Sequence, residues 1–320
     1  MNVLGFQKIM QPSCEESVMK ILAVLLFLLV NIFANKLEVT TSILPQKYFI
    51  EKIGGDKVRV NAMVQPGFSP HTYEPKISQM RQLSSSKAYF FIGVSFENVW
   101  LDKFKAANKN LVFIDTTKGI QKIAMQEHAH EDEEEEGHDH GHKDEHKDEK
   151  HDEHDEYEGL DPHVWLDPIL VKTMAKNIYV TLVELDSTNK AYYQANYEKF
   201  IQELDALYLE LKNQLAGVKG SAFMVFHPSW GYFAQRFDLE QIAVEVAGKE
   251  PKPNQMIELI EKAKEHTIKT LFVAPEFSQK SANVIASTIQ GKVVAISPLD
   301  EKWDETLRHA AKMIVESHQK

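Results

Sequence analysis

The feature that most constrains the fold is an alternation of short β-rich runs and helical stretches, which occurs twice along the chain. The first set of β-rich runs covers residues 37–43, 58–64, 88–94 and 111–115, with helices expected near 45–54, 75–86 and 96–107. The second set covers residues 221–226, 241–246, 270–274 and 292–296, with helices expected near 229–237, 253–266, 279–290 and 303–318. Strands separated by helices form parallel sheets that are covered on both faces. The sequence therefore predicts two α/β lobes.

The segment between the two sets has helical periodicity. Its apolar residues recur at steps of three and four, and they are Tyr193, Tyr197, Phe200, Leu204, Leu207, Leu211 and Leu215. This spacing predicts one apolar stripe along a helix of about 28 residues over 189–217, ended by Gly217. Such a helix would be about 42 Å long. We expect a stiff connector between the lobes; an ordinary core helix of the second lobe is the alternative.

The N-terminal region has the order of a secretory signal. In residues 19–36 a lysine precedes an apolar run, and cleavage is expected after Ala34. The run is shorter than the roughly 20 residues of a membrane span, although an uncleaved anchor is the alternative. We expect residues 1–34 to be an upstream extension plus signal peptide, with Met19 as an alternative start, and the mature protein to be periplasmic.

The remaining boundaries follow from these patterns. We expect a first lobe over residues 35–188, a linking helix over 189–217 and a second lobe over 218–320. The only cysteine, Cys14, precedes the apolar run, whereas a lipid-anchored bacterial protein would carry its cysteine after it. The exported chain is therefore expected to have no thiol, disulfide or lipid anchor, and to be soluble.

A charged insert over residues 127–158 interrupts the first lobe. It contains 17 acidic residues against three lysines, a net charge of −14, whereas the whole chain carries −11, so the rest of the protein is slightly basic. It also holds eight of the fourteen histidines: His128, His130, His138, His140, His142, His146, His151 and His154. Such a composition predicts a disordered loop. Because neutral imidazole binds Zn, Cu and Ni, we expect weak auxiliary metal sites here, with a solvating acidic linker as the alternative.

Outside the insert, three histidines lie beside prolines in loop contexts: His71 in "PGFSPHTYEP", His163 in "DPHVWLDP" and His227 in "FHPSWGYF". Each follows a strand end or opens a helix, and ligands of open α/β sheets lie beyond the carboxyl ends of the strands. Zinc binds neutral imidazole nitrogens and prefers four ligands, so three histidines leave a fourth position for water or a carboxylate. The wide separation of these histidines matches no local zinc motif. His266 and His309 lie in helical patterns and are expected to be surface or packing residues.

These three motifs, in this order and split by a His- and acid-rich insert, resemble the zinc-specific periplasmic binding proteins of ABC importers. The resemblance covers essentially the whole mature chain. It implies two α/β lobes joined by one long helix, with Zn²⁺ held between them by His71, His163 and His227. It also implies delivery of the ion to a membrane permease that works with a cytoplasmic ATPase. A monomer with no enzymatic activity and no nucleic-acid partner is expected.

Two details bear on the metal and its fourth ligand. In manganese relatives the residue equivalent to His227 is commonly a glutamate, and an additional imidazole favours zinc over manganese. A manganese or other transition-metal protein of the same class is the alternative, and the Irving–Williams order alone would favour copper. Several relatives have an acidic residue before the first histidine or an aspartate in the last lobe, where this chain has Pro70 and Ser297. We expect water as the fourth ligand, with Asp300 or Glu74 as alternatives.

A zinc-dependent hydrolase is the remaining functional alternative, because three histidines plus water also form a catalytic zinc pattern. Glu74 and Asp161 lie near the ligands in sequence and could transfer protons. No HExxH helix, nucleophile elbow or glycine-rich phosphate loop occurs in the sequence. An adhesin or an extracellular metal buffer is a further alternative, but no sequence feature marks a face for host molecules. The sequence therefore favours a carrier.

Overall fold

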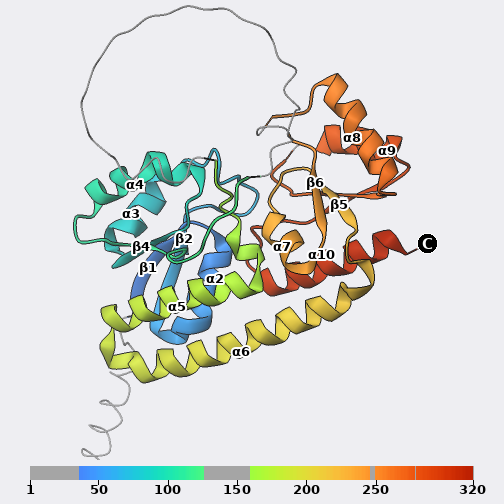
Figure 1. Ribbon diagram of the computed structural model, residues 1–320. Helices are drawn as coiled ribbons and strands as arrows, with labels where there is room; N and C mark the ends of the chain where they lie inside the picture. Colours follow the sequence, from blue (N-terminus) through green and yellow to red (C-terminus); the bar gives the residue numbers. More distant parts are fainter. Residues whose placement is uncertain (1–35, 126–158, 246–248, 278, 320) are drawn as a thin grey trace, which may run out of the picture. The chain divides into compact units, whose positions relative to one another are not determined.

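The computed structural model describes residues 36–125, 159–245, 249–277 and 279–319 (Figure 1). The predicted signal segment, residues 1–34, and the acidic insert, residues 127–158 with its eight histidines, lie outside the described residues. Within the described ranges, no helix combines the length and the apolar character needed to cross a bilayer.

The N-terminal lobe is built on a four-stranded parallel sheet in the order β2-β1-β3-β4. The strands are β1 (Leu37–Thr41), β2 (Val58–Ala62), β3 (Ala88–Phe91) and β4 (Val112–Asp115). The helices between them are α2 (Leu44–Gly54), α3 (Ile77–Ser85) and α4 (Ser95–Ala107). In the register of the central pair, Thr40 lies beside Tyr89, and the paired residues 39–41 of β1 and 88–90 of β3 are buried. The apolar strand residues thus face helices on both sides, as parallel sheets require.

The C-terminal lobe repeats this topology with the strand order β6-β5-β7-β8, again fully parallel. Its strands are β5 (Ala222–Val225), β6 (Glu240–Ala243), β7 (Thr270–Val273) and β8 (Lys292–Ala295). Its helices are α7 (Gly231–Phe237), α8 (Pro253–Glu265), α9 (Gln279–Thr288) and α10 (Trp303–His318). The prediction of two parallel α/β lobes is therefore confirmed.

The first strand is shorter than predicted, and local hydrogen bonding explains where it ends. The Gln46 side-chain oxygen accepts the backbone N–H groups of Ser42 and Ile43 at 3.2 and 3.3 Å. It also accepts the Thr41 hydroxyl at 2.7 Å. The Ser42 N–H also donates to the Phe90 carbonyl of β3 at 3.3 Å, so the sheet bonding fades at Ser42 while Gln46 draws the chain directly into α2.

Helix α5 (Pro168–Leu185) was not among the predicted elements. A local signal for it is nevertheless present. The Asp167 carboxylate caps the helix by accepting the N–H of Ile169 at 2.8 Å, and Pro168 occupies the first turn. An aspartate followed by a proline is a common helix start, because the side chain satisfies a free N–H and proline needs none.

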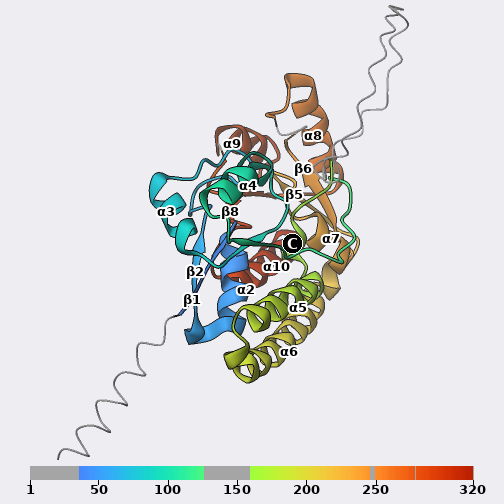
Figure 2. The same ribbon diagram turned by 90° about the vertical axis from the view of Figure 1, so that its left-hand side faces the viewer.

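The long connector is α6 (Lys190–Gln214), 25 residues, followed by a short 3₁₀ turn at Ala216–Val218. Its predicted apolar stripe is the buried face, apart from Tyr197, which is half-buried and stacks on Tyr179 of α5 with centroids 4.8 Å apart. Helices α5 and α6 run side by side in both views (Figures 1 and 2). Helix α6 packs on α2 and α5 and also on α10 of the C-terminal lobe, so it belongs to both lobes.

One hydrophobic core extends through both lobes, from Val39 in β1 to Ile314 in α10. A second, separate core lies within the C-terminal lobe and includes Leu259 of α8 and Ile285 of α9. The continuous core means that the strand ends of the two lobes are held near one another by buried apolar surface, which is the dominant favourable term in folding.

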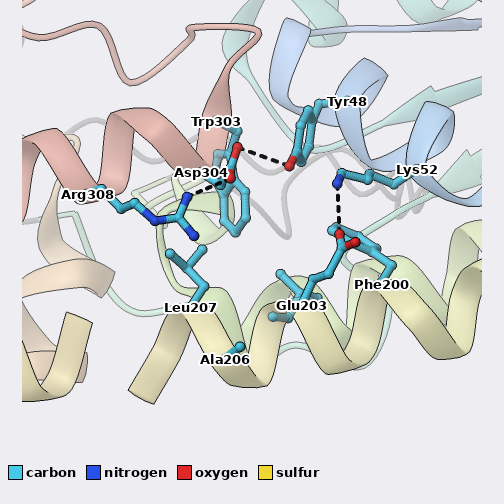
Figure 3. A pocket seen from close by; sticks show the side chains of 10 residues that line it. Tyr48, Lys52, Phe200, Glu203, Ala206, Leu207, Trp303, Asp304 and Arg308 are labelled. Atoms are coloured by element: carbon cyan, nitrogen blue, oxygen red, sulfur yellow. Dashed lines mark hydrogen bonds and ion pairs between the residues drawn. The ribbon is translucent and has the colours of Figure 1, made fainter. Parts of the chain in front are cut away.

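The base of α10 is also tied to α2 and α6 by polar contacts around a cleft of about 250 Å³ (Figure 3). Tyr48 of α2 donates its hydroxyl hydrogen to Asp304 of α10 at 3.0 Å, and Arg308 binds the same carboxylate at 2.6 Å. Lys52 of α2 forms an ion pair with Glu203 of α6 at 2.7 Å. These half-exposed pairs each contribute little stability, but together they fix the three helices at the junction of the lobes.

Candidate metal site

The structure brings His71, His163 and His227 together. His71 lies in the loop after β2, His163 directly precedes the 3₁₀ turn Val164–Leu166, and His227 follows β5. Each of the three offers one ligand atom, and these atoms all lie within 4.8 Å of one another. Among the described residues, no other group of three or more His, Cys, Asp or Glu side chains meets this condition.

The spacing of the nitrogens suits a small tetrahedral cation. The Nε2 atoms of His71 and His227 are 3.0 Å apart. Ring centroids are separated by 4.7 Å for His71 and His227, by 5.4 Å for His163 and His227, and by 6.3 Å for His71 and His163. Zinc–nitrogen bonds of about 2.0–2.1 Å place two tetrahedral ligand atoms about 3.3 Å apart. Small side-chain adjustments would therefore complete the geometry.

Carboxylates form hydrogen bonds with the Nδ1 atoms of two of the three rings, on the side away from the Nε2 atoms. The Asp161 Oδ1 atom lies 2.7 Å from His163 Nδ1 and accepts the backbone N–H of His163 at 2.8 Å. The Glu245 Oε2 atom lies 2.6 Å from His227 Nδ1. An ionised carboxylate only accepts hydrogen bonds, so the Nδ1 atoms of both histidines carry the hydrogen. Their Nε2 lone pairs are thereby free for a metal, which is the arrangement typical of metal-binding imidazoles.

His71 has a different partner, the Ser95 hydroxyl at the start of α4, 3.1 Å from His71 Nδ1. A hydroxyl can donate or accept, so Ser95 is compatible with either tautomer of His71. In the zinc-binding tautomer, His71 donates its Nδ1 hydrogen to Ser95 and points its Nε2 lone pair at the site. The first imidazole is thus oriented by a neutral, exposed group, whereas the other two are oriented by buried carboxylates.

Burial favours the neutral form of two of the imidazoles, His71 and His227. The pKa of His71 is lowered from 6.5 to about 3, chiefly because burial penalises the charged ring and secondarily because His227 and His163 are close. Burial also lowers the pKa of His227, although the neighbouring Glu245 opposes the shift. A neutral ring is the metal-binding form, so His71 and His227 stay ready to bind a cation below the reference histidine pKa.

This burial changes the expected pH dependence of zinc binding. Exposed imidazoles with the reference pKa would bind zinc progressively more weakly below about pH 6.5, because protons compete for the same nitrogens. Since the pKa values of His71 and His227 are lowered, proton competition at these rings begins at lower pH. We expect the tight-site dissociation constant to rise by less than about 10-fold between pH 7.5 and 5.5, against about 1000-fold for three imidazoles at the reference pKa. Competition titrations with a zinc chelator across this range would measure it, and a 1000-fold loss would contradict the buried arrangement.

The two alternatives for a fourth ligand lie outside this group. Glu74 is exposed, and the exposed Asp300 accepts the backbone N–H of Lys302 at 2.8 Å with its Oδ1 atom. Water as the fourth ligand stays a prediction. His266 caps the C-terminus of α8 and His309 is exposed on α10, away from the group of three.

Sequence reasoning did not identify two residues that shape the site. Glu245 follows β6 and is 8% exposed, and Phe277 stacks on the His227 ring with centroids 4.9 Å apart. The only indication of a role for Glu245 in the sequence is its position just after β6, a strand that neighbours β5 in the sheet. Residues beyond the carboxyl ends of neighbouring parallel strands meet at one edge, so an acidic residue there was a candidate partner for His227.

Two parallel α/β lobes joined by one long helix, with three convergent imidazoles contributed by both, define a metal-binding protein of the solute-binding class that serves ABC importers. The comparison with known families agrees. The chain belongs to the family described as zinc-uptake complex component A, periplasmic (ZnuA), whose sequence model matches residues 39–317.

Individual relatives support this assignment. The chain is 29% identical over 275 residues to the high-affinity zinc uptake system protein ZnuA of Bacillus subtilis, an alignment that covers 83% of this chain and 79% of that protein. A crystal structure of ZnuA is similar with a TM-score of 0.77 and 39% identity, covering 89% of this chain and all of the other. A ZnuA deletion mutant with zinc bound gives a TM-score of 0.77 at 38% identity, covering 89% of this chain and 99% of that one.

Proposed function

We propose that this protein captures Zn²⁺ in the periplasm with His71, His163 and His227 and delivers the ion to the membrane permease of an ABC importer. The convergence of three buried or half-buried imidazoles from both lobes carries the proposal. The family, described as a periplasmic zinc-uptake component, supports the compartment and the importer. The permease and its cytoplasmic ATPase are the partners that this role requires, and the protein acts as a monomer.

The donor set favours zinc among the divalent metals. All three donors are imidazole nitrogens, which suit zinc, whereas manganese and magnesium are better served by carboxylate and carbonyl oxygens. The two nearby carboxylates bind imidazole hydrogens, which leaves the rings as the donors toward the ion. Water completes four-coordination at zinc.

We infer a carrier rather than a hydrolase. A hydrolase would need a base near the metal, but Asp161 is buried and accepts two hydrogen bonds from His163, while Glu74 is exposed. The decisive experiment is metal analysis of protein purified from its own compartment, combined with a titration. One tightly bound zinc per chain with no turnover of ester or peptide substrates supports the carrier. Turnover that depends on zinc, or a tight site filled by manganese, would overturn it.

The histidine-rich insert provides a second test of this function. Deleting residues 127–158 is expected to lower total bound zinc to about one ion per chain while the tight dissociation constant changes by less than about threefold. The physical reason is that the tight site keeps its three ligands, whereas the weaker multivalent ions are lost. Loading from a competing chelator should become slower, because the insert no longer raises the local zinc concentration near His163.

A matched control for this deletion keeps the length of the insert and replaces its eight histidines with asparagine. If capture by imidazole is the mechanism, this variant should load as slowly as the deletion. If it loads as quickly as the wild type, the insert acts through its acidic charge alone. Loss of tight binding in the deletion would instead mean that the insert supplies a ligand to the tight site.

A further inference from the structure

His163 belongs to the N-terminal lobe by sequence order, but the residues around it are hydrogen-bonded to the C-terminal lobe. By sequence order the residue precedes the linking helix and so falls in the N-terminal lobe. We infer that the C-terminal lobe positions His163, through Tyr232 and Trp303, and that opening of the site separates His71 from the other two histidines. This inference rests on the proposed zinc-binding function.

The first connection runs through Tyr232 on α7 of the C-terminal lobe. Its hydroxyl donates to the backbone carbonyl of Asp161 at 2.9 Å and accepts the backbone N–H of Ile123 at 3.0 Å. Asp161 in turn holds both the ring and the backbone N–H of His163. Tyr232 is 2% exposed, so its hydroxyl bonds are made away from water, where losing one is costly. The Tyr232 hydroxyl therefore fixes the residue that orients His163.

The second connection is a reciprocal pair of indole hydrogen bonds. Trp165 donates its Nε1 hydrogen to the carbonyl of Pro298 at 2.8 Å, and Trp303 donates its Nε1 hydrogen to the carbonyl of Trp165 at 2.7 Å. Both tryptophans are almost fully buried, and the Trp165 ring lies 5.0 Å from the His163 ring. The turn that follows His163 is thus bonded at two points to the segment that leads into α10 and to α10 itself.

A third contact lies at the start of α5. Arg236 on α7 binds the nearly buried Asp167 carboxylate with two nitrogens, Nε at 2.8 Å and Nη2 at 2.7 Å. Both nitrogens bind the same oxygen, Oδ2, while Oδ1 accepts the N–H of Ile169, so the carboxylate joins α7 to the start of α5. Within residues 161–167, Asp161, Trp165 and Asp167 are therefore each hydrogen-bonded to the C-terminal lobe. The backbone N–H of Asp161 also donates to the carbonyl of Ile123, at 2.8 Å.

The loop of His71 is held by its own lobe. The Pro70 carbonyl accepts the N–H of Phe96 at 3.2 Å, and His71 Nδ1 contacts Ser95 of the same helix. A relative movement of the lobes would therefore leave His163 beside His227 and move His71 away. Release of zinc then begins with loss of the His71 ligand, and the ion remains on the two carboxylate-supported imidazoles until the permease takes it.

The test combines two conservative substitutions with a double-mutant cycle in the full-length protein. Tyr232→Phe removes the hydroxyl and keeps the ring, whereas Trp303→Phe removes the indole N–H donor and replaces the buried indole with a smaller phenyl ring. Each is expected to weaken zinc binding by about 3- to 10-fold, less than the 10- to 100-fold typical of direct partners of a ligand. Trp100→Phe on α4 and Tyr179→Phe on α5 are the matched controls and should leave the affinity unchanged. Affinities are measured by chelator competition, and folding by circular dichroism.

The cycle separates positioning of His163 from a general loss of stability. In a His163→Ala background, Trp303→Phe and Tyr232→Phe should change zinc affinity by less than about twofold, because they act through the missing ring. In a His71→Ala background the full effect should remain. Equal effects in both backgrounds, or no effect in the wild type, would overturn the inference while leaving the proposed function intact. If the Trp303→Phe variant does not fold, Tyr232→Phe, which removes only one hydroxyl, tests the inference by itself. A wild-type protein without a tight zinc site would overturn the proposed function itself.

Discussion

Replacing His227 with alanine is expected to weaken tight zinc binding by more than about 100-fold, beyond the range typical for changes around a metal ligand. The substitution removes the imidazole that follows β5 of the C-terminal lobe and leaves the buried Glu245 carboxylate without its ring partner. The protein should remain folded, because the His227 ring lies at the strand edge rather than in either hydrophobic core. Chelator competition at pH 7.5 would measure the change.

The matched control is His309→Ala, which removes an exposed imidazole on α10 and should leave the tight dissociation constant unaltered. Circular dichroism of both variants would verify that the fold is retained. An unchanged affinity in the His227 variant would remove this residue from the metal site and would leave the C-terminal lobe without an identified ligand.

Replacing Glu245 with glutamine is expected to weaken zinc binding by about 10- to 100-fold, although this residue does not contact the ion. The glutamine keeps the size of the side chain but loses the charge that holds the Nδ1 hydrogen of His227 at 2.6 Å. Without the carboxylate, the ring is free to adopt the other tautomer, and its Nε2 atom is a weaker base. Isothermal titration in competition with a chelator would give the change in affinity.

Two comparisons make the Glu245 result interpretable. Glu258→Gln changes an exposed glutamate on α8 and should have no effect on zinc affinity. Ser95→Ala removes the partner of His71 and should have a smaller effect than Glu245→Gln, because the lost group is neutral and exposed. Equal losses of zinc affinity for Ser95→Ala and Glu245→Gln would show that a negative charge beside the histidine Nδ1 atom does not strengthen zinc binding.

The three histidines could be found from the sequence because each stands beside a proline in a loop next to a predicted strand or helix. The strands themselves were visible as buried apolar runs, and the stripe from Tyr193 to Leu215 indicated α6. Glu245 could not be assigned in the same way, because its partner His227 follows a different strand. The pattern of apolar residues within a strand does not reveal that β6 lies beside β5 in the sheet. The hydrogen bond between Trp303 and Trp165 joins residues 138 positions apart, which only the tertiary fold brings together.

Helix α6 has a thermodynamic consequence. Both lobes pack on the same 25-residue helix. Helix α10 is joined to it by the Arg308–Glu210 ion pair, and to α2 by the buried rings of Trp303 and Phe49. Ordering a flexible linker would cost about 1–2 kcal/mol of backbone entropy for each residue fixed. In this protein the connector is already ordered when the chain folds. Binding of an ion should therefore cause little further loss of backbone conformational entropy. The entropy of binding should then be governed by release of water from zinc and from the three rings, and the change in heat capacity should be small.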